Sequence, residues 1–127
     1  MRVLYVCTGN SFRSPVAEAL TRKYKPALEV ESAGTDPAAG VAVNARQLLE
    51  TEDALSYVKP HPEALSQRAV KEADRIVAMT DRHRDYLLEN FGVDGEDIDV
   101  WGIEDPVEPG VEPAEVFSQI KKRVKHL

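Results

Sequence analysis

Short apolar segments alternate along the chain with longer segments whose apolar residues recur every three or four positions. The short segments predict β-strands, because they are either continuously apolar or alternate apolar with polar residues. They cover residues 3–6, 28–33, 75–79 and 98–101. The longer segments predict helices by their apolar spacing, and these start near Ser14, Val41, Leu65, Asp81 and Pro113. Strands that alternate with helices favour an α/β domain with a mostly parallel sheet.

Polar and proline residues predict where two of these helices start. Ser14 is a candidate N-cap with Pro15 at the first helical position, and Asp81 is a candidate cap for the fourth helix. The one linker-like stretch, 104–115, repeats Val-Glu-Pro and suggests a loop of the site or a loose connection. Since 127 residues suffice for one core, we expect one domain over residues 1–127.

Composition and charge narrow the classes of function. A net charge of −6 and a pI near 5.1 disfavour a nucleic-acid binder. A lone cysteine and three histidines without metal-ligand spacing predict no disulfide and no metal site, and His83 and His126 are expected to be solvated. No segment is typical of a signal peptide or membrane span, so we expect a cytoplasmic protein without a membrane partner.

The most informative segment is the loop after the first strand, Cys7-Thr8-Gly9-Asn10-Ser11-Phe12-Arg13-Ser14. Ligands of open parallel sheets bind at the carboxyl ends of the strands. Amides of a loop that enters a helix there can surround an anion, with Gly9 and Asn10 adopting the unusual dihedral angles. Arg13 would add a planar fork for two phosphate oxygens. Thr8 to Ser14 therefore form a candidate phosphate-binding loop.

Cys7 lies on the floor of that loop, where the same field favours the thiolate. A thiolate beneath a bound phosphate can attack phosphorus, and the Ser14 hydroxyl can hydrogen-bond the sulfur. A cysteine on a buried strand is also commonly a simple core residue. The position of Cys7 at the end of the strand, before a glycine-containing loop, is what favours a nucleophile over a core residue. A Walker lysine and a dinucleotide fingerprint are absent, which weakens a nucleotide-binding interpretation.

The segment Cys7 to Pro15 closely resembles the signature of the low-molecular-weight protein tyrosine phosphatases, a family that includes protein arginine phosphatases and thioredoxin-coupled arsenate reductases. The resemblance extends over the whole chain, since 32–35 (Ser-Ala-Gly-Thr) and 73–79 match further motifs in the right order. It implies a three-layer α/β/α fold with a four-stranded parallel sheet of order 2-1-3-4, and no cofactor.

The resemblance also implies roles for individual residues. Cys7 would be the nucleophile, Arg13 the main side-chain phosphate ligand, and Asp105, of the pair Asp105-Pro106, the general acid and then base. Asn10 would hold the loop's conformation and Ser14 would assist the thiolate. His61 resembles a family histidine that hydrogen-bonds the loop asparagine, although an ordinary loop histidine is an equal alternative.

Departures from the family bear on substrate. Phe12 replaces a second cysteine that protects the nucleophile in many members, so no protective disulfide can form here. Tyrosine-specific relatives tend to have a bulky aliphatic residue at the position of Ser11, whereas arginine phosphatases have a threonine. Residues 36–41 lack an aromatic side chain, and Val107-Glu108 replaces paired tyrosines. These departures favour phosphoarginine or a general role over phosphotyrosine.

Three functions therefore remain open. The first is a protein phosphatase that hydrolyses phosphomonoesters or phosphoarginine, in phosphorylated proteins or small molecules, through a phosphocysteine intermediate on Cys7 with Asp105 as general acid and base. The second is an arsenate reductase, which would need an external thiol because Cys7 is the only cysteine. The third is a non-catalytic phosphate-binding module. Oligomeric state is not marked by any motif, and a monomer is favoured.

Overall fold

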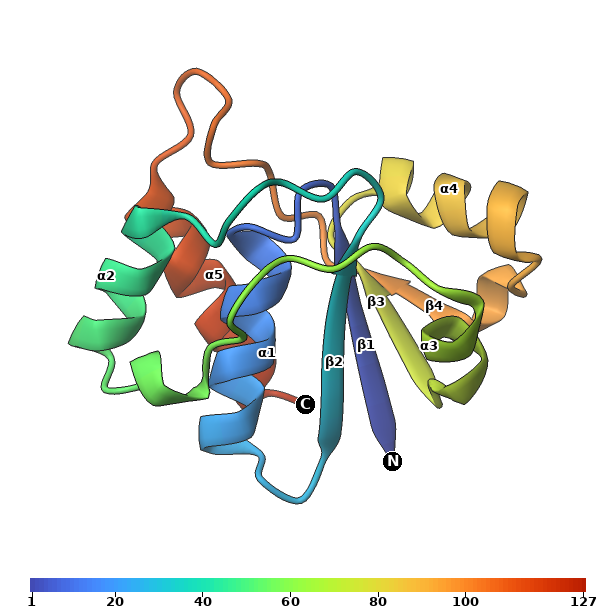
Figure 1. Ribbon diagram of the computed structural model, residues 1–127, viewed down its shortest axis with the longest axis horizontal. Coiled ribbons are helices and arrows are strands. Elements are labelled where there is room, and N and C mark those ends of the chain that lie inside the picture. Colours follow the sequence, from blue (N-terminus) through green and yellow to red (C-terminus); the bar gives the residue numbers. More distant parts are fainter.

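Four parallel strands form the sheet at the centre of the protein, as seen in the computed structural model, which describes residues 1–127 (Figure 1). The strands lie in the order β2-β1-β3-β4. Their bounds are Arg2–Cys7 (β1), Glu29–Gly34 (β2), Arg75–Ala78 (β3) and Ile98–Val100 (β4). The expected α/β class and the strand order 2-1-3-4 are both confirmed.

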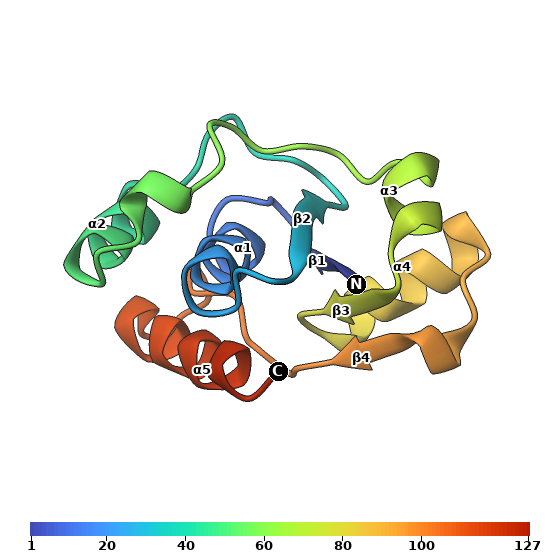
Figure 2. The same ribbon diagram turned by 90° about the horizontal axis from the view of Figure 1, so that it is seen from below.

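Helices cover both faces of this sheet and complete three layers (Figure 2). On one face lie α1 (Arg13–Tyr24), α2 (Val43–Thr51) and α5 (Pro113–Lys125). On the other face lie α3 (Gln67–Glu72) and α4 (Asp81–Phe91). Two short 3-10 turns, Leu55–Tyr57 and Gly95–Asp97, complete the regular structure. None of the helices combines the length and apolar character that crossing a bilayer requires.

The central strand β1 divides the core, because its side chains alternate between the two faces. Val3 and Tyr5 belong to the larger apolar cluster, under α1 and α5, and Leu4 and Val6 belong to the smaller one, under α3 and α4. All four are essentially inaccessible to solvent. The buried Trp101 ring packs in the larger cluster, with its centroid 5.3 Å from that of the Tyr5 ring.

Two helix starts differ from the sequence prediction. Helix α1 begins at Arg13, and Ser14 does not cap it because its hydroxyl bonds Cys7 and Asn10 instead. Helix α4 is capped by Thr80, whose side chain accepts from the third helical residue, whereas Asp81 is the first residue inside the helix. At α4 the neighbouring Thr80 thus takes the role predicted for Asp81, whereas α1 begins after Phe12 without a side-chain cap.

Gly34 allows the loop after β1 to lie directly against the end of β2. A Cβ at this position would stand 2.4 Å from the Thr8 carbonyl oxygen and 3.0 Å from the Asn10 nitrogen, so no larger residue fits without displacing backbone. This steric restriction explains why a glycine occupies the third position of the motif Ser-Ala-Gly-Thr at 32–35. It brings the loop to the carboxyl edge of the sheet, the top of the molecule in Figure 1.

Candidate active site

The loop between β1 and α1 turns its carbonyl groups outward. The carbonyls of Cys7, Thr8 and Gly9 accept hydrogen bonds from amides of Thr35 to Ala38, and that of Ser11 accepts from the Ala42 amide. None of the amide N–H groups of Thr8 to Phe12 donates to another protein atom. These amides therefore line a concave loop at the start of α1, where unpaired donors and the helix dipole favour an anion.

Asn10 is the residue that holds the loop in this shape. It is fully buried and adopts a left-handed backbone conformation, φ 50°, which asparagine tolerates better than most residues. Its Oδ1 accepts from the Glu63 amide at 2.8 Å, and its Nδ2 donates to Ser14 Oγ at 2.8 Å. Gly9 was expected to need unusual dihedral angles as well, but only Asn10 has a positive φ within the loop.

Cys7 ends β1 with its side chain buried and directed at Ser14. The Sγ and Ser14 Oγ lie 2.8 Å apart. Because Asn10 already donates to Ser14 Oγ, the Ser14 hydroxyl proton is available for the sulfur. The chain Asn10–Ser14–Cys7 thus presents a hydrogen-bond donor to the thiol sulfur, as an oriented thiolate would require.

Arg13 and Asp105 meet at the mouth of the loop although they stand 92 positions apart. The Arg13 guanidinium is 4% exposed, donates to the Ile103 carbonyl at 3.0 Å and lies 3.4 Å from Asp105 Oδ2. The Asp105 carboxylate also accepts from the Val107 amide at 3.1 Å and is one-third exposed. The structure therefore brings Cys7, Arg13 and Asp105 to one site.

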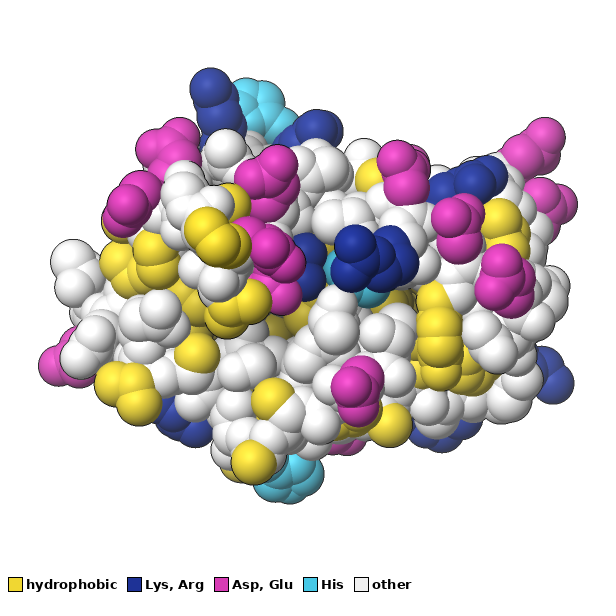
Figure 3. Space-filling model, turned by 90° about the horizontal axis from the view of Figure 1, so that it is seen from above, with side chains coloured by type: hydrophobic (Ala, Val, Ile, Leu, Met, Phe, Trp, Pro, Cys, Tyr) yellow, Lys and Arg dark blue, Asp and Glu magenta, His cyan; other side chains and the backbone are white.

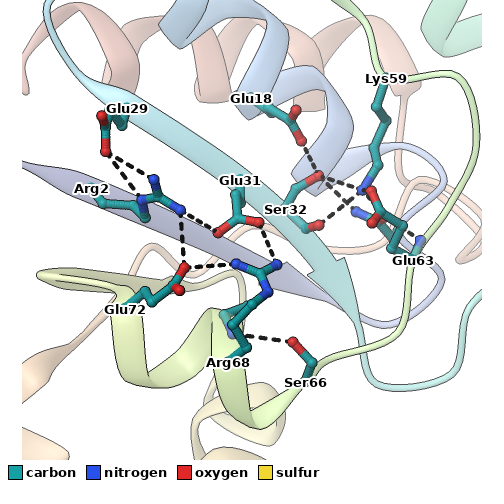
Figure 4. A network of polar contacts seen from close by, with 12 residues as sticks. Arg2, Glu18, Glu29, Glu31, Ser32, Lys59, Glu63, Ser66, Arg68 and Glu72 are labelled. Carbon is teal, nitrogen blue, oxygen red and sulfur yellow. Dashed lines mark hydrogen bonds and ion pairs between the residues drawn. The ribbon is translucent and has the colours of Figure 1, made fainter.

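A buried lysine, which the sequence did not mark, supports the loop from behind (Figure 4). Lys59 is 4% exposed, and its Nζ donates to Asn10 Oδ1 at 2.7 Å and to the Ser32 carbonyl at 2.9 Å. Glu63 pairs with the same ammonium at 3.0 Å. The Ser32 hydroxyl in turn donates to Glu18, whose pKa is raised by burial.

The prediction that His61 hydrogen-bonds Asn10 is wrong. His61 is exposed, and its only hydrogen bond is a 3.3 Å contact with the neighbouring Pro62 carbonyl. The residue two positions earlier, Lys59, bonds Asn10 instead. Nothing in the sequence distinguished this lysine, because a lysine beside a proline is ordinarily exposed.

The prediction that His83 is solvated is also wrong. Only 2% of His83 is exposed, and its Nε2 lies 2.8 Å from Thr8 Oγ1 in the loop. Burial, together with the charges of Arg13 and Arg82, lowers its pKa to about 4. The signal that could have found it is its position at the third residue of a helix that starts just after a strand's carboxyl end, the edge at which ligands bind.

Two hollows meet at the loop. The smaller, about 270 Å³, lies over Cys7 and is bordered outside the loop by Ala38, Ala42, Asn44, Pro106 and Val107. The larger, about 560 Å³, extends toward the start of α4 and Glu104 to Val111. Thr8, Arg13 and Asp105 border both. Figure 3 shows acidic and basic side chains side by side at the centre of this face.

Of the remaining loop residues, Ser11 donates its hydroxyl to the Gly40 carbonyl at 2.8 Å, and Phe12 is buried in the larger core cluster. The His, Cys, Asp and Glu side chains form no group of three or more that could hold a metal ion. At the loop itself, Arg13 and the backbone amides are groups that could stabilise the negative charge of a bound dianion.

We expect Lys59→Met to destabilise the protein by about 3 kcal/mol, because it removes the two hydrogen bonds that a buried ammonium donates to Asn10 Oδ1 and to the Ser32 carbonyl. Urea unfolding monitored by circular dichroism measures this free energy. The matched control is Glu63→Gln, which alters only the exposed partner and is expected to cost less than about 1 kcal/mol. Equal losses for the two variants would contradict the supporting role of Lys59.

The buried His83 ring makes the stability of the protein depend on pH. Its folded pKa, about 4, lies below the ordinary value of 6.5, so folding favours the neutral ring. The resulting contribution of His83 to the free energy of unfolding is fully present above about pH 6.5 and is lost as the pH falls toward 4. Its total size is on the order of 3 kcal/mol. Unfolding free energies across this range should fall less steeply for His83→Gln than for the unmodified protein. The exposed His126 is the control: His126→Gln should leave the slope unchanged, and an unchanged slope in His83→Gln would refute the assignment.

Comparisons with known proteins agree with this architecture. The chain is 33% identical over 97 residues to the low-molecular-weight protein-tyrosine-phosphatase PtpB of Staphylococcus haemolyticus, and the match covers 75% of this chain and 68% of that protein. It is 37% identical over 93 residues to a protein-arginine-phosphatase of Geobacillus stearothermophilus, with 71% and 62% covered. The chain thus spans about two-thirds of the length of these curated relatives.

A solved structure and a family model extend the match to the whole chain. The crystal structure of the low-molecular-weight protein tyrosine phosphatase from T. tengcongensis superimposes with a TM-score of 0.79 at 29% identity, covering 100% of this chain and 99% of that one. The family model described as low molecular weight phosphotyrosine protein phosphatase matches residues 2–127. The chain therefore belongs to the low-molecular-weight phosphotyrosine protein phosphatase family.

Proposed function

We propose that this chain is a protein phosphatase that hydrolyses phosphomonoesters or phosphoarginine through a phosphocysteine intermediate on Cys7. The observation that supports this most strongly is the placement of a buried thiol, 2.8 Å from Ser14 Oγ, beneath loop amides that have no other acceptor. Family membership gives the class of reaction. The roles of individual residues rest on their geometry.

In the first step the Cys7 thiolate forms a bond to phosphorus as the bond from phosphorus to the leaving oxygen or nitrogen breaks. Arg13 and the loop amides hold the phosphoryl oxygens, whose negative charge they stabilise. Asp105 donates a proton to the leaving atom, because an alkoxide or a deprotonated guanidine leaves poorly. A bound phosphate would compete with Asp105 for the Arg13 guanidinium and so turn the carboxyl toward the leaving group.

In the second step a water molecule attacks phosphorus and the phosphorus–sulfur bond breaks. Asp105, now a carboxylate, takes a proton from that water, so the acid of the first step is the base of the second. The Ser14 hydroxyl donates to the departing sulfur, which leaves as the thiolate. Inorganic phosphate is released, and every group of the chain returns to its starting protonation state.

The walls of the small cavity favour phosphoarginine over phosphotyrosine. Outside the loop they include the short side chains of Ala38, Ala42 and Val107. The one aromatic residue on the border, Phe12, is buried in the larger core cluster and so offers little ring surface for stacking on a phenyl group. Ser11 presents its Oγ to Gly40 and adds no aliphatic bulk to the cavity. One of the curated relatives is a protein-arginine-phosphatase, which makes this substrate class chemically reasonable here.

The two other functions fit the site less well. Arsenate reduction would need an external thiol, since Cys7 is the only cysteine. A binding module needs neither a thiol aimed at its ligand nor a carboxylate beside it, yet Asp105 contacts Arg13 at the cavity mouth. Neither alternative is favoured by a specific contact.

We expect Cys7→Ser to abolish phosphate release from aryl phosphates in a metal-free buffer. Asp105→Asn should reduce kcat about 100-fold on phenyl phosphate, whose phenoxide leaves poorly without a proton. On p-nitrophenyl phosphate, whose leaving group is a weaker base, the same variant should show a smaller reduction of kcat. Steady-state kinetics on both substrates checks this. Equal losses on the two, or wild-type turnover by Cys7→Ser, would refute the assigned roles.

The substrate proposal is tested at Ser11. Ser11→Ile places an aliphatic side chain in the small cavity and removes the bond to Gly40, so it should shift the ratio of kcat/KM from phosphoarginine toward phosphotyrosine peptides about tenfold. Ser11→Thr is the matched control, because it adds a methyl group but keeps the hydroxyl. If Ser11→Ile and Ser11→Thr give the same ratio, residue 11 does not select the substrate.

A further inference from the structure

The His83 ring joins α4 to the phosphate loop and has no part in the mechanism above. It is buried, and both ring nitrogens are engaged. The Nδ1 lies 3.2 Å from the Thr80 amide nitrogen and 3.0 Å from Thr80 Oγ1, and the Nε2 lies 2.8 Å from Thr8 Oγ1. The ring therefore spans the distance from the helix N-terminus to the residue that follows the nucleophile.

The hydrogen bond from the Thr80 amide fixes which nitrogen carries the proton. A backbone N–H can only donate, so the Nδ1 of His83 must accept. A neutral imidazole that accepts at one nitrogen carries its proton at the other, and so the Nε2–H donates to Thr8 Oγ1. Burial of the ring lowers the pKa of His83 and favours its neutral form, and the charges of Arg13 and Arg82 act in the same direction, whereas Asp105 opposes them.

Because the Thr8 oxygen accepts the hydrogen bond from His83, the proton of the Thr8 hydroxyl has no protein acceptor. The contact with His83 is the only side-chain hydrogen bond of Thr8, and the Thr8 oxygen is the acceptor in it. Thr8 borders both hollows together with Arg13 and Asp105, so its side chain lies at the wall of the phosphate site. A substrate bound there would supply acceptors in its phosphoryl oxygens.

We propose that Thr8 contacts the substrate through its hydroxyl, which donates to a phosphoryl oxygen, and that His83 is a positioning residue that holds this donor in direction. The proposal rests on the phosphatase function proposed above and adds one donor to the loop amides and Arg13. No bond is made or broken at Thr8 or His83. His83 acts only through Thr8, and this sets it apart from a residue that merely stabilises the fold.

The test uses orthovanadate, an oxyanion of the same charge class as phosphate, whose binding does not need turnover. Thr8→Val keeps the shape of the side chain and removes the hydroxyl, and it should weaken vanadate binding and kcat/KM roughly tenfold. His83→Leu should give a similar loss. His83→Gln, whose amide can donate from near the Nε2 position, should restore most of it. Calorimetric titration and steady-state kinetics measure the two quantities.

The double variant Thr8→Val/His83→Leu decides whether the two residues act as a unit. If they do, it should bind vanadate no more weakly than Thr8→Val alone, even though its melting temperature falls further. Additive losses in vanadate affinity would overturn the positioning role of His83. Unchanged vanadate affinity and unchanged kcat/KM in Thr8→Val would overturn the contact itself.

These outcomes separate the inference from the proposed function. If the unmodified protein turns over aryl phosphates in a Cys7-dependent way while Thr8→Val matches it throughout, the inference is wrong and the phosphatase function holds. If the unmodified protein turns over no phosphate but binds vanadate through Thr8, the function is wrong and the anion contact holds.

Discussion

The outward orientation of the loop carbonyls is the constraint on which the rest of the site depends. Amides of Thr35 to Ala42 take up the carbonyls of Cys7, Thr8, Gly9 and Ser11, which leaves the loop amides to face a common centre. An anion bound there would meet these donors and the positive end of α1. In the proposed function, the loop that holds the phosphoryl group also holds the Cys7 sulfur beneath it, so one arrangement would serve both binding and attack.

Three features far apart in the sequence hold this orientation. Gly34 lets β2 approach within backbone contact of the loop, and Asn10 supplies the one left-handed turn. Lys59 then fixes Asn10 from below through a buried hydrogen bond. Because the ammonium is almost wholly buried, loss of its hydrogen bonds to Asn10 and Ser32 would leave a desolvated charge, and this cost stabilises the arrangement.

The sequence predicted the parts of this site that are contiguous or carry a family motif. The strand-loop-helix from Cys7 to Ser14 is local, so its spacing was sufficient to propose an anion site there, and the alternation of strands and helices was sufficient to predict the fold class. Asp105 was found only through the resemblance, and the structure places it beside Arg13. The strand order likewise came from the family, because apolar spacing does not encode which strands are neighbours.

Lys59 and His83 were missed because their partners are distant. Lys59 meets Asn10 across 49 positions and His83 meets Thr8 across 75, so neither pairing leaves a local pattern. Polar side chains are buried when a specific partner satisfies them, and such a partner is visible only in the folded chain. His61 was proposed because it resembles a family histidine, but Lys59 is the residue whose side chain is buried and bonds Asn10, and His61 is exposed.

The most direct test of the central claim is to trap the covalent intermediate. Asp105→Asn slows loss of phosphate from sulfur, so acid quenching during turnover of p-nitrophenyl phosphate, followed by peptide mass spectrometry, should find the phosphoryl group on the Cys7 thiol. The Cys7→Ala variant of the same protein should show neither turnover nor modification. Continued turnover by the Cys7→Ala variant, or a phosphoryl group on any other side chain, would contradict the account.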